Sequence, residues 1–347
     1  MKGRLRLVSW GAAIAAFAAG AAGQSAVSKP ANSPVKSVAP SKKWTVPRTP
    51  DGHPDLQGVW TNSTLTPLER PADLANKSHF ASQQEADAWA KNLFASVTGD
   101  RRDGGPQADV GRSYNEFWRD RGNSAIASLR TSLITDPADG RVPALTATGE
   151  KRQADQRAYQ RAHPADGPED RSLWERCLTR GLPIVPGPYN NDFQIVQAPG
   201  YVAILHEMIH DVRIIPLDKA SDPRPHVPLT IRQWMGDPRG HWEGDTLVIE
   251  SSNFSEKTNF RGSSEGMYLV ERLTRVDADT INYQFTVDDP GIFARPFSGE
   301  VPMNKTPDQV YEYACSEGNY ALRGILGAAR QEESNAEAKA AAGKGSK

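Results

Sequence analysis

Residues 193–210 read FQIVQAPGYVAILHEMIH, and this stretch decides the fold. Two runs of β-branched and large apolar residues, 193–197 and 201–205, stand on either side of the pair Pro199-Gly200. Two such runs joined by a proline–glycine turn are typical of antiparallel strands. The stretch therefore predicts a β-hairpin, and with it a fold in which antiparallel strands dominate.

Similar hairpin signals follow along the chain. Residues 268–276 and 281–287 flank a polar turn, and residues 246–250 follow a turn at 241–245. Apolar and polar residues alternate along 281–287, which is the pattern of a strand with one buried face. A further short strand is expected at residues 310–315. Hairpins at this spacing predict a mainly β protein, an antiparallel meander barrel or a sandwich, with a lipocalin-like barrel as one form.

The part of the chain before these hairpins carries helical signals. Ser82 and Glu85 have the spacing of a capping box, and the apolar residues after them repeat with a helical period. A second helix is expected over residues 148–161. We therefore expect a helical or irregular N-terminal portion over residues 44–180, and an antiparallel β domain over residues 181–332.

Composition narrows the class of protein. The chain has 347 residues, of which 38% are hydrophobic and 24% charged, so it can bury a core. Its 41 basic and 42 acidic residues nearly balance, and we expect neither a nucleic-acid partner nor stable membrane insertion. Residues 24–43 predict a disordered linker. The Ala-, Glu- and Lys-rich stretch from Leu322 predicts a C-terminal helix that ends in a flexible tail over residues 333–347.

The N-terminus has the pattern of a secretory signal peptide. Lys2, Arg4 and Arg6 precede an apolar run over residues 7–23, and small residues at its end fit a cleavage site. The run is 17 residues long, fewer than the roughly 20 that span a bilayer. We expect residues 1–23 to be a signal peptide and the mature protein to be periplasmic or secreted.

Cys177 and Cys315 are the only cysteines. In an exported chain they are able to form one disulfide, because that compartment is oxidising. The alternative is two separate buried thiols.

His206-Glu207-Met208-Ile209-His210 is a literal H-E-x-x-H motif. On a helix the two histidines of this motif bind one zinc, and the glutamate activates a water. The surrounding β-branched residues, the lack of an N-cap and the nearby Pro216 argue against a helix. We predict that residues 201–209 are extended, with His206 and Glu207 on opposite sides of a sheet and no metal bound. A zinc site at His206 and His210 is the alternative.

Other polar residues stand beside the predicted strands and turns. An arginine, a carboxylate and a histidine that converge in a barrel mouth could bind an anionic or hydroxylated small molecule, or perform acid/base chemistry. Alternatively, Arg213 pairs with Asp211 or Glu207 and the asparagines satisfy turns. Trp174, Trp234 and Trp242 are candidates to stack on a sugar or another ring, or they close the core. The expected binding residues are Arg180, Tyr189, Asn191, Arg213 and Glu317.

Five segments of the chain resemble a widespread, largely uncharacterised family of exported bacterial β-rich proteins. The resemblance implies an exported β fold, and it implies site roles for Glu207 and His210, which match the usual family pattern. It argues against zinc, because similar members often have another residue at His206. Ser316 stands where a histidine is more usual. The segments that carry the resemblance are 47–60, 189–218, 233–253, 269–290 and 311–319.

These observations lead to one expected function and two alternatives. We expect an exported β protein that handles a small organic ligand, working as an acid/base hydrolase or lyase through Glu207 and His210 without a metal cofactor. The first alternative is a zinc-dependent metallohydrolase that uses the HEMIH motif. The second is a non-catalytic envelope or interaction protein.

Overall fold

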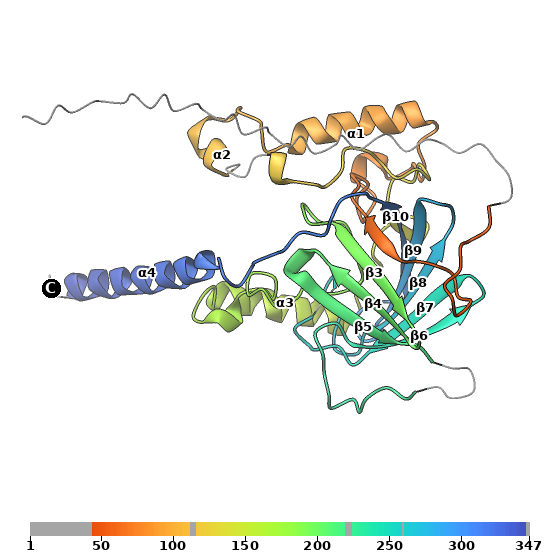
Figure 1. Cartoon of the computed structure of the whole chain (residues 1–347). Coiled ribbons are helices and arrows are strands. Elements are labelled where there is room, and N and C mark those ends of the chain that lie inside the picture. The colour runs from red at the N-terminus through yellow and green to blue at the C-terminus, as the bar shows by residue number, and fades with distance from the viewer. Residues whose placement is uncertain (1–43, 112–115, 219–223, 259, 345–347) are drawn as a thin grey trace, which may run out of the picture. The chain divides into compact units, whose positions relative to one another are not determined.

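Ten strands form one sheet that curls into a nearly closed barrel, shown in the computed structural model of Figure 1. The structure describes residues 44–111, 116–218, 224–258 and 260–344, so the predicted signal peptide and linker lie outside the described residues. The strands are β1 (Gly58–Thr61), β2 (Ile134–Asp136), β3 (Asp192–Ala198), β4 (Tyr201–His206), β5 (Asp211–Pro216), β6 (Asp237–Glu243), β7 (Thr246–Ser252), β8 (Tyr268–Arg275), β9 (Thr280–Asp288) and β10 (Phe297–Lys305).

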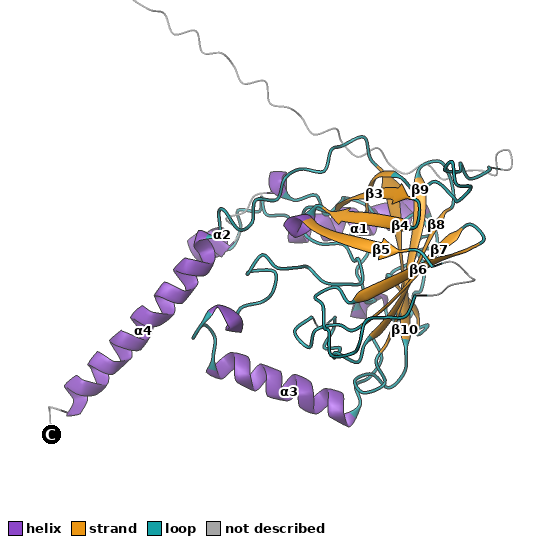
Figure 2. Ribbon diagram, turned by 60° about the horizontal axis from the view of Figure 1, so that its bottom comes forward, coloured by secondary structure: helices purple, strands orange, loops and turns teal. Residues whose placement is uncertain are grey.

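The helices lie outside the sheet (Figure 2). Ser82 Oγ accepts a hydrogen bond of 3.2 Å from the Glu85 N–H at the start of α1, which confirms the predicted N-cap. The helix predicted over 148–161 is α3, and the C-terminal helix α4 continues to Lys344. The helices are α1 (Gln83–Val97), α2 (Gly105–Gly111), α3 (Ala147–Ala162) and α4 (Tyr320–Lys344), with short 3-10 turns η1 (Ala72–Leu74), η2 (Glu116–Trp118), η3 (Pro168–Asp170) and η4 (Met208–His210).

The strands pair in the order β5-β4-β3-β1-β10-β9-β8-β7-β6, and β2 pairs with β10. The hairpin predicted around Pro199-Gly200 is β3 and β4, with Ile195 opposite Ile204. The predicted pair over 268–287 is β8 and β9, whose alternate residues are buried as the apolar–polar pattern requires. The mainly β fold is confirmed, and it takes the barrel form.

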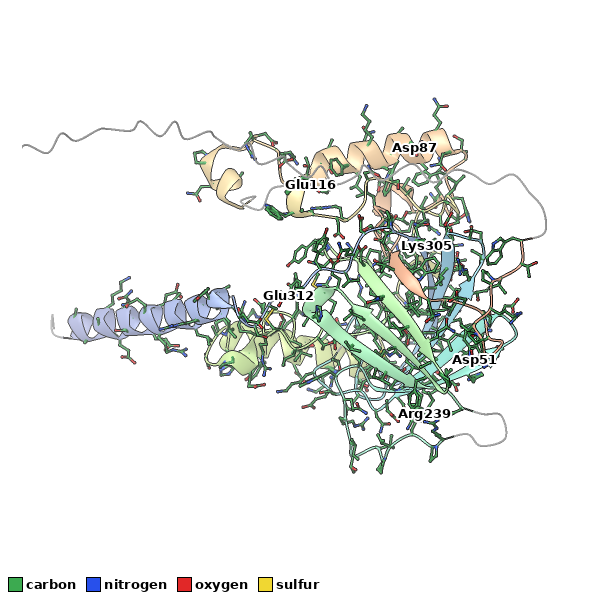
Figure 3. The ribbon with its side chains drawn as sticks, in the orientation of Figure 1. Asp51, Asp87, Glu116, Arg239, Lys305 and Glu312 are labelled. Carbon is green, nitrogen blue, oxygen red and sulfur yellow. A yellow bond between two sulfur atoms is a disulfide. The ribbon has the colours of Figure 1, made fainter. Side chains whose placement is uncertain are left out.

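Five strands, β1, β2, β5, β6 and β10, lie outside the runs that the sequence pattern predicts as strands. β1 and β2 belong to the segment expected to be helical or irregular, and β10 follows β9 as a third consecutive strand. The strand predicted at residues 310–315 is wrong, since that segment has no strand partner. Its backbone instead passes the end of β4, where the Tyr311 N–H donates to Glu207 Oε1 at 3.2 Å. Figure 3 labels Glu312 on this segment.

A short contact between β5 and β6 closes the barrel. Leu217 forms an isolated parallel bridge with Gly240, and the Asp218 N–H donates to the Gly240 carbonyl at 2.7 Å. A side chain at position 240 would meet Leu217 and Ile215, so the absence of a Cβ allows the two strands to approach. The contact that closes the barrel therefore depends on Gly240, a glycine that no turn requires.

Cys177 and Cys315 form a disulfide, with their Cα atoms 5.7 Å apart. The disulfide joins the loop before β3 to the segment between β10 and α4. Among the described residues, no helix combines the length and apolar character needed to cross a membrane.

Gly299 gives a test of the barrel interior. It lies on β10 opposite Phe285, and a Cβ there would collide with the buried phenyl ring. We expect Gly299→Ala to lower the free energy of unfolding by about 1–3 kcal/mol, the usual cost of overpacking a core. Urea unfolding followed by circular dichroism measures the change.

Gly327→Ala is the matched control, because Gly327 lies on α4 with open space around its Cα. Alanine is favoured over glycine in a helix, so this variant should be neutral or more stable. Equal losses in the two variants would contradict the proposed packing at Phe285.

Candidate functional site

A cleft of about 1800 Å³ opens at one end of the barrel. Its lining includes Phe193 at the start of β3 and His206 at the end of β4. Phe254 follows β7, Met267 precedes β8 and Ile292 follows β9, and all three also line the cleft. Because neighbouring strands are antiparallel, these positions share the same end of the barrel. The loops that precede β3 and the residues of α3 form the outer wall.

His206 is the most buried titratable group of the cleft lining. Its side chain is 4% exposed and packs edge-on against Phe193, with ring centroids 5.0 Å apart. Its Nε2 has no hydrogen-bond partner among the described residues. Burial and the positive charge of Arg213 lower the pKa of His206 to about 3, so the imidazole is neutral at physiological pH. A buried polar atom without a partner is costly to fold, and a ligand could satisfy it.

Arg213 adds to the effect of burial on the pKa of His206. It lies on β5 and is almost completely buried, as is Glu271 on β8. Arg213 Nη2 lies 2.5 Å from Glu271 Oε2 and donates to Ser251 Oγ at 2.7 Å. The Arg213 partner is thus Glu271, which lies far along the chain from Asp211 and Glu207.

Tyr283 extends this buried network toward the cleft. Its hydroxyl donates to Glu271 Oε1 and accepts from the Ile184 N–H, both at 2.9 Å. Burial and the charge of Glu271 raise the pKa of Tyr283 well above its ordinary value, so it remains a donor. The Ile184 bond holds the segment before β3 over the end of the barrel, where Ile184 lines the cleft.

Aromatic and basic side chains meet in the outer wall. The Arg180 guanidinium lies 4.6 Å above the Trp174 ring, and Tyr189 lies beside Trp174 with ring centroids 6.1 Å apart. All three residues line the cleft. Arg180 and Tyr189 were predicted binding residues, and the structure brings them together with Trp174.

Asn191 is buried and has a role within the protein. Its side-chain NH₂ donates to Asp120 Oδ1 at 3.0 Å and to the Gly187 carbonyl at 3.1 Å. Its side-chain oxygen accepts from the Gly187 N–H at 2.6 Å. These bonds shape the loop that precedes β3, so Asn191 positions the cleft wall. The polar atoms of its side chain bond to the protein itself.

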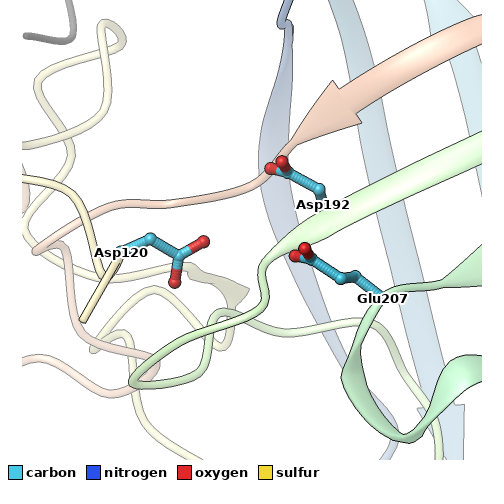
Figure 4. A group of neighbouring side chains, drawn as sticks. All are labelled: Asp120, Asp192 and Glu207. Atoms are coloured by element: carbon cyan, nitrogen blue, oxygen red, sulfur yellow. The ribbon is translucent and has the colours of Figure 1, made fainter. Parts of the chain in front are cut away.

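Glu207 belongs to a second group of side chains (Figure 4). Asp120, Asp192 and Glu207 each offer a carboxylate oxygen, and these oxygens lie within 4.8 Å of one another. Oxygen ligands at this spacing could hold a divalent cation. The group also has protein donors, since the Asn191 N–H donates to Asp120 and the Tyr311 N–H donates to Glu207. None of the three carboxylates lines the cleft.

The HEMIH motif forms the end of β4 and a tight turn. The prediction of extended backbone is right through His206 and wrong for residues 207–209, because the chain reverses there to enter β5. Ile209 and His210 have left-handed φ values of 63° and 57°. His206 lines the cleft, whereas Glu207 joins the acidic group. Glu207 lies in the turn after β4, so the prediction that the two residues face opposite sides of a sheet is wrong for Glu207. Without a helix, the motif lacks the geometry by which H-E-x-x-H binds zinc.

The remaining predicted residues lie apart from the cleft. The side chain of His210 is exposed on its turn, and the backbone N–H of His210 donates to the backbone carbonyl of Glu207 at 3.1 Å. Glu317 is also exposed, two residues after the disulfide. Glu271 and Tyr283 were not among the predicted site residues. Glu271 had a detectable signal, since it stands between Leu269 and Leu273 on the apolar face of a predicted strand.

Comparison of the chain with models of known protein families, with curated proteins and with solved structures finds no match. The resemblance to exported bacterial proteins stays a prediction, and the chemistry of the site rests on its geometry.

The lowered pKa of His206 predicts a pH dependence of stability. Between its ordinary value of 6.5 and about 3, the unfolded state binds a proton that the folded state does not. Stability from this group is therefore present above pH 6.5 and is lost as the pH falls toward 3. We expect His206→Leu to reduce the slope of unfolding free energy against pH by about 1.4 kcal/mol per pH unit between those limits. Urea unfolding at several pH values tests this, and parallel profiles for both proteins would contradict it.

For Glu207 we predict the opposite pH dependence, in which stability falls as the pH rises. Burial and the charge of Asp120 raise its pKa, so ionisation is less favourable in the folded than in the unfolded state. Its unfavourable contribution appears as the pH rises through the folded pKa and is absent at low pH. In the presence of a chelator, Glu207→Gln should raise Tm by a few degrees at pH 8 and leave it unchanged near pH 4. Exposed Glu317→Gln is the control, and a lower Tm for Glu207→Gln at pH 8 would show that the negative charge is needed.

Proposed function

We propose that this protein binds a small organic molecule in the cleft at the open end of its barrel. The observation that carries the proposal is the neutral, buried His206, whose Nε2 has no described partner in a large cleft. The cleft combines apolar side chains, among them Phe193, Phe254 and Ile292, with many polar and charged ones, and both kinds of group take part in ligand sites. A ligand N–H or O–H that reaches His206 would supply the hydrogen bond that the protein lacks.

The buried charges behind His206 support a binding role. Arg213 Nε and Nη1 also have no hydrogen-bond partner among the described residues. Hydrophobic residues at these positions would stabilise a barrel at least as well as an ion pair with unused donors. A buried ion pair with unused donors is expected beside a ligand site. The charges of Arg213 and Glu271 also set the electrostatic field at the inner end of the cleft, where His206 lies.

The site of action in this proposal is the periplasm or the cell exterior. The disulfide supports it, because disulfides persist in oxidising compartments and are rare in the cytosol. The N-terminal pattern of basic and apolar residues points the same way.

An acid/base reaction at Glu207 and His210 stays a prediction. Glu207 is buried in the acidic group and His210 is exposed on its turn, and neither lines the cleft. Binding at His206 is therefore the function that the geometry supports best, and it requires no catalytic step.

The test is fluorescence titration with N-phenyl-naphthylamine, a neutral aromatic amine that carries one N–H donor. We expect the wild-type protein to bind it, and His206→Leu to weaken binding roughly three- to tenfold through loss of one neutral hydrogen bond.

His241→Leu is the matched control, because His241 lies on β6 and does not line the cleft. It should leave the affinity unchanged. Absence of binding to the wild-type protein, or equal affinity for wild type and His206→Leu, would count against the proposal.

A further inference from the structure

Most basic side chains in the cleft wall have an acidic partner. Arg176 lies 2.6 Å from Glu169, and Lys257 lies 2.8 Å from the same carboxylate. Arg171 likewise pairs with Glu175 at 2.5 Å. These pairs use their charges within the protein, so they offer little to a bound molecule.

Arg180 differs from these residues. No acidic side chain of the described residues forms an ion pair with it, and the ionisable groups that face it are the hydroxyls of Tyr189 and Tyr313. It is exposed to the cleft, and its guanidinium stacks on Trp174. Stacking holds the guanidinium plane and leaves the N–H groups at its edge available. Two such N–H groups match a planar oxyanion in a bidentate arrangement.

The inner end of the cleft favours an uncharged group. The neutral His206 lies there against the ring of Phe193, and buried Leu133 also lines the cleft. Burying an unpaired charge in such surroundings is costly, whereas an aromatic or aliphatic body gains from burial. The cleft thus has a cationic outer part at Arg180 and an apolar inner part at His206.

We infer that the ligand is an aromatic anion: a planar ring system with a carboxylate or sulfonate that binds Arg180 and stacks near Trp174, and an uncharged body directed toward His206. This inference rests on the proposed binding function and adds the class of ligand. Glu256 and Glu265 also line the cleft, and both follow β7 in the loop before β8. Their charges would repel the anionic group, which favours its placement at Arg180.

Two fluorescent probes that differ by one charged group test the inference. Anilinonaphthalene sulfonate carries a sulfonate on the same ring framework as neutral N-phenyl-naphthylamine. We expect Arg180→Gln to weaken binding of the sulfonate about tenfold, the loss of one charge-assisted interaction, and to change the neutral probe less than twofold. Added salt should weaken the sulfonate alone.

Arg176→Gln is the matched control, because Arg176 lines the same cleft but pairs with Glu169. It should affect neither probe strongly. Trp174→Leu should weaken both probes, since the ring stacks on the shared framework. Circular dichroism and Tm confirm that each variant is folded, and Arg180→Lys, which keeps the charge, provides a second variant if Arg180→Gln is unstable. It should retain more affinity for the sulfonate than Arg180→Gln.

The outcomes separate the two proposals. Failure of the neutral probe to bind the wild-type protein would overturn the binding function itself. Binding of both probes with no selective loss in Arg180→Gln and Arg180→Lys would leave that function standing and overturn the inferred anionic class. If Arg176→Gln also weakened the binding of the sulfonate probe alone, the inferred anionic class would be overturned. The effect would then come from the overall charge of the cleft and not from Arg180.

Discussion

The positive charge of Arg213 lies inside the barrel, and the surrounding structure depends on balancing it. Glu271 supplies the opposite charge from across the barrel, and Tyr283 donates to Glu271. The Ile184 N–H in turn donates to Tyr283, which ties the segment before β3 to the barrel interior. Together with burial, which is the larger cause, the same charge lowers the pKa of the neighbouring His206. One ion pair therefore links the strands of the barrel, the cleft wall and the protonation state at the cleft floor.

The end of β4 separates the polar features of this protein. His206, the last residue of β4, lines the cleft, whereas Glu207 begins the turn after it and belongs to the acidic group with Asp120 and Asp192. Adjacent residues of one motif thus serve different surroundings, because the chain leaves the strand between them. A helix at this position would have placed both histidines on one side and produced a different chemistry.

Local patterns predicted much of the fold, and long-range contacts account for what they missed. The hairpins around residues 193–205 and 268–287 were predictable because alternation and turn residues act within a few positions. β1 was not, since it owes its strand character to pairing with β3 and β10. The site shows the same division. Arg180 and Tyr189, which were predicted from their position beside a hairpin, line the cleft. The Arg213 partner could not be predicted, because Glu271 lies on another strand and is brought there by barrel closure.

The disulfide has a topological consequence. Cys177 and Cys315 enclose every strand from β3 to β10 in one covalent ring. A single backbone cut anywhere between them, for example in the long loop between β5 and β6, opens the ring and releases no fragment. A protease must therefore cut twice within the ring before it detaches a piece of it. The barrel can carry a nick and still hold its strands on one connected molecule.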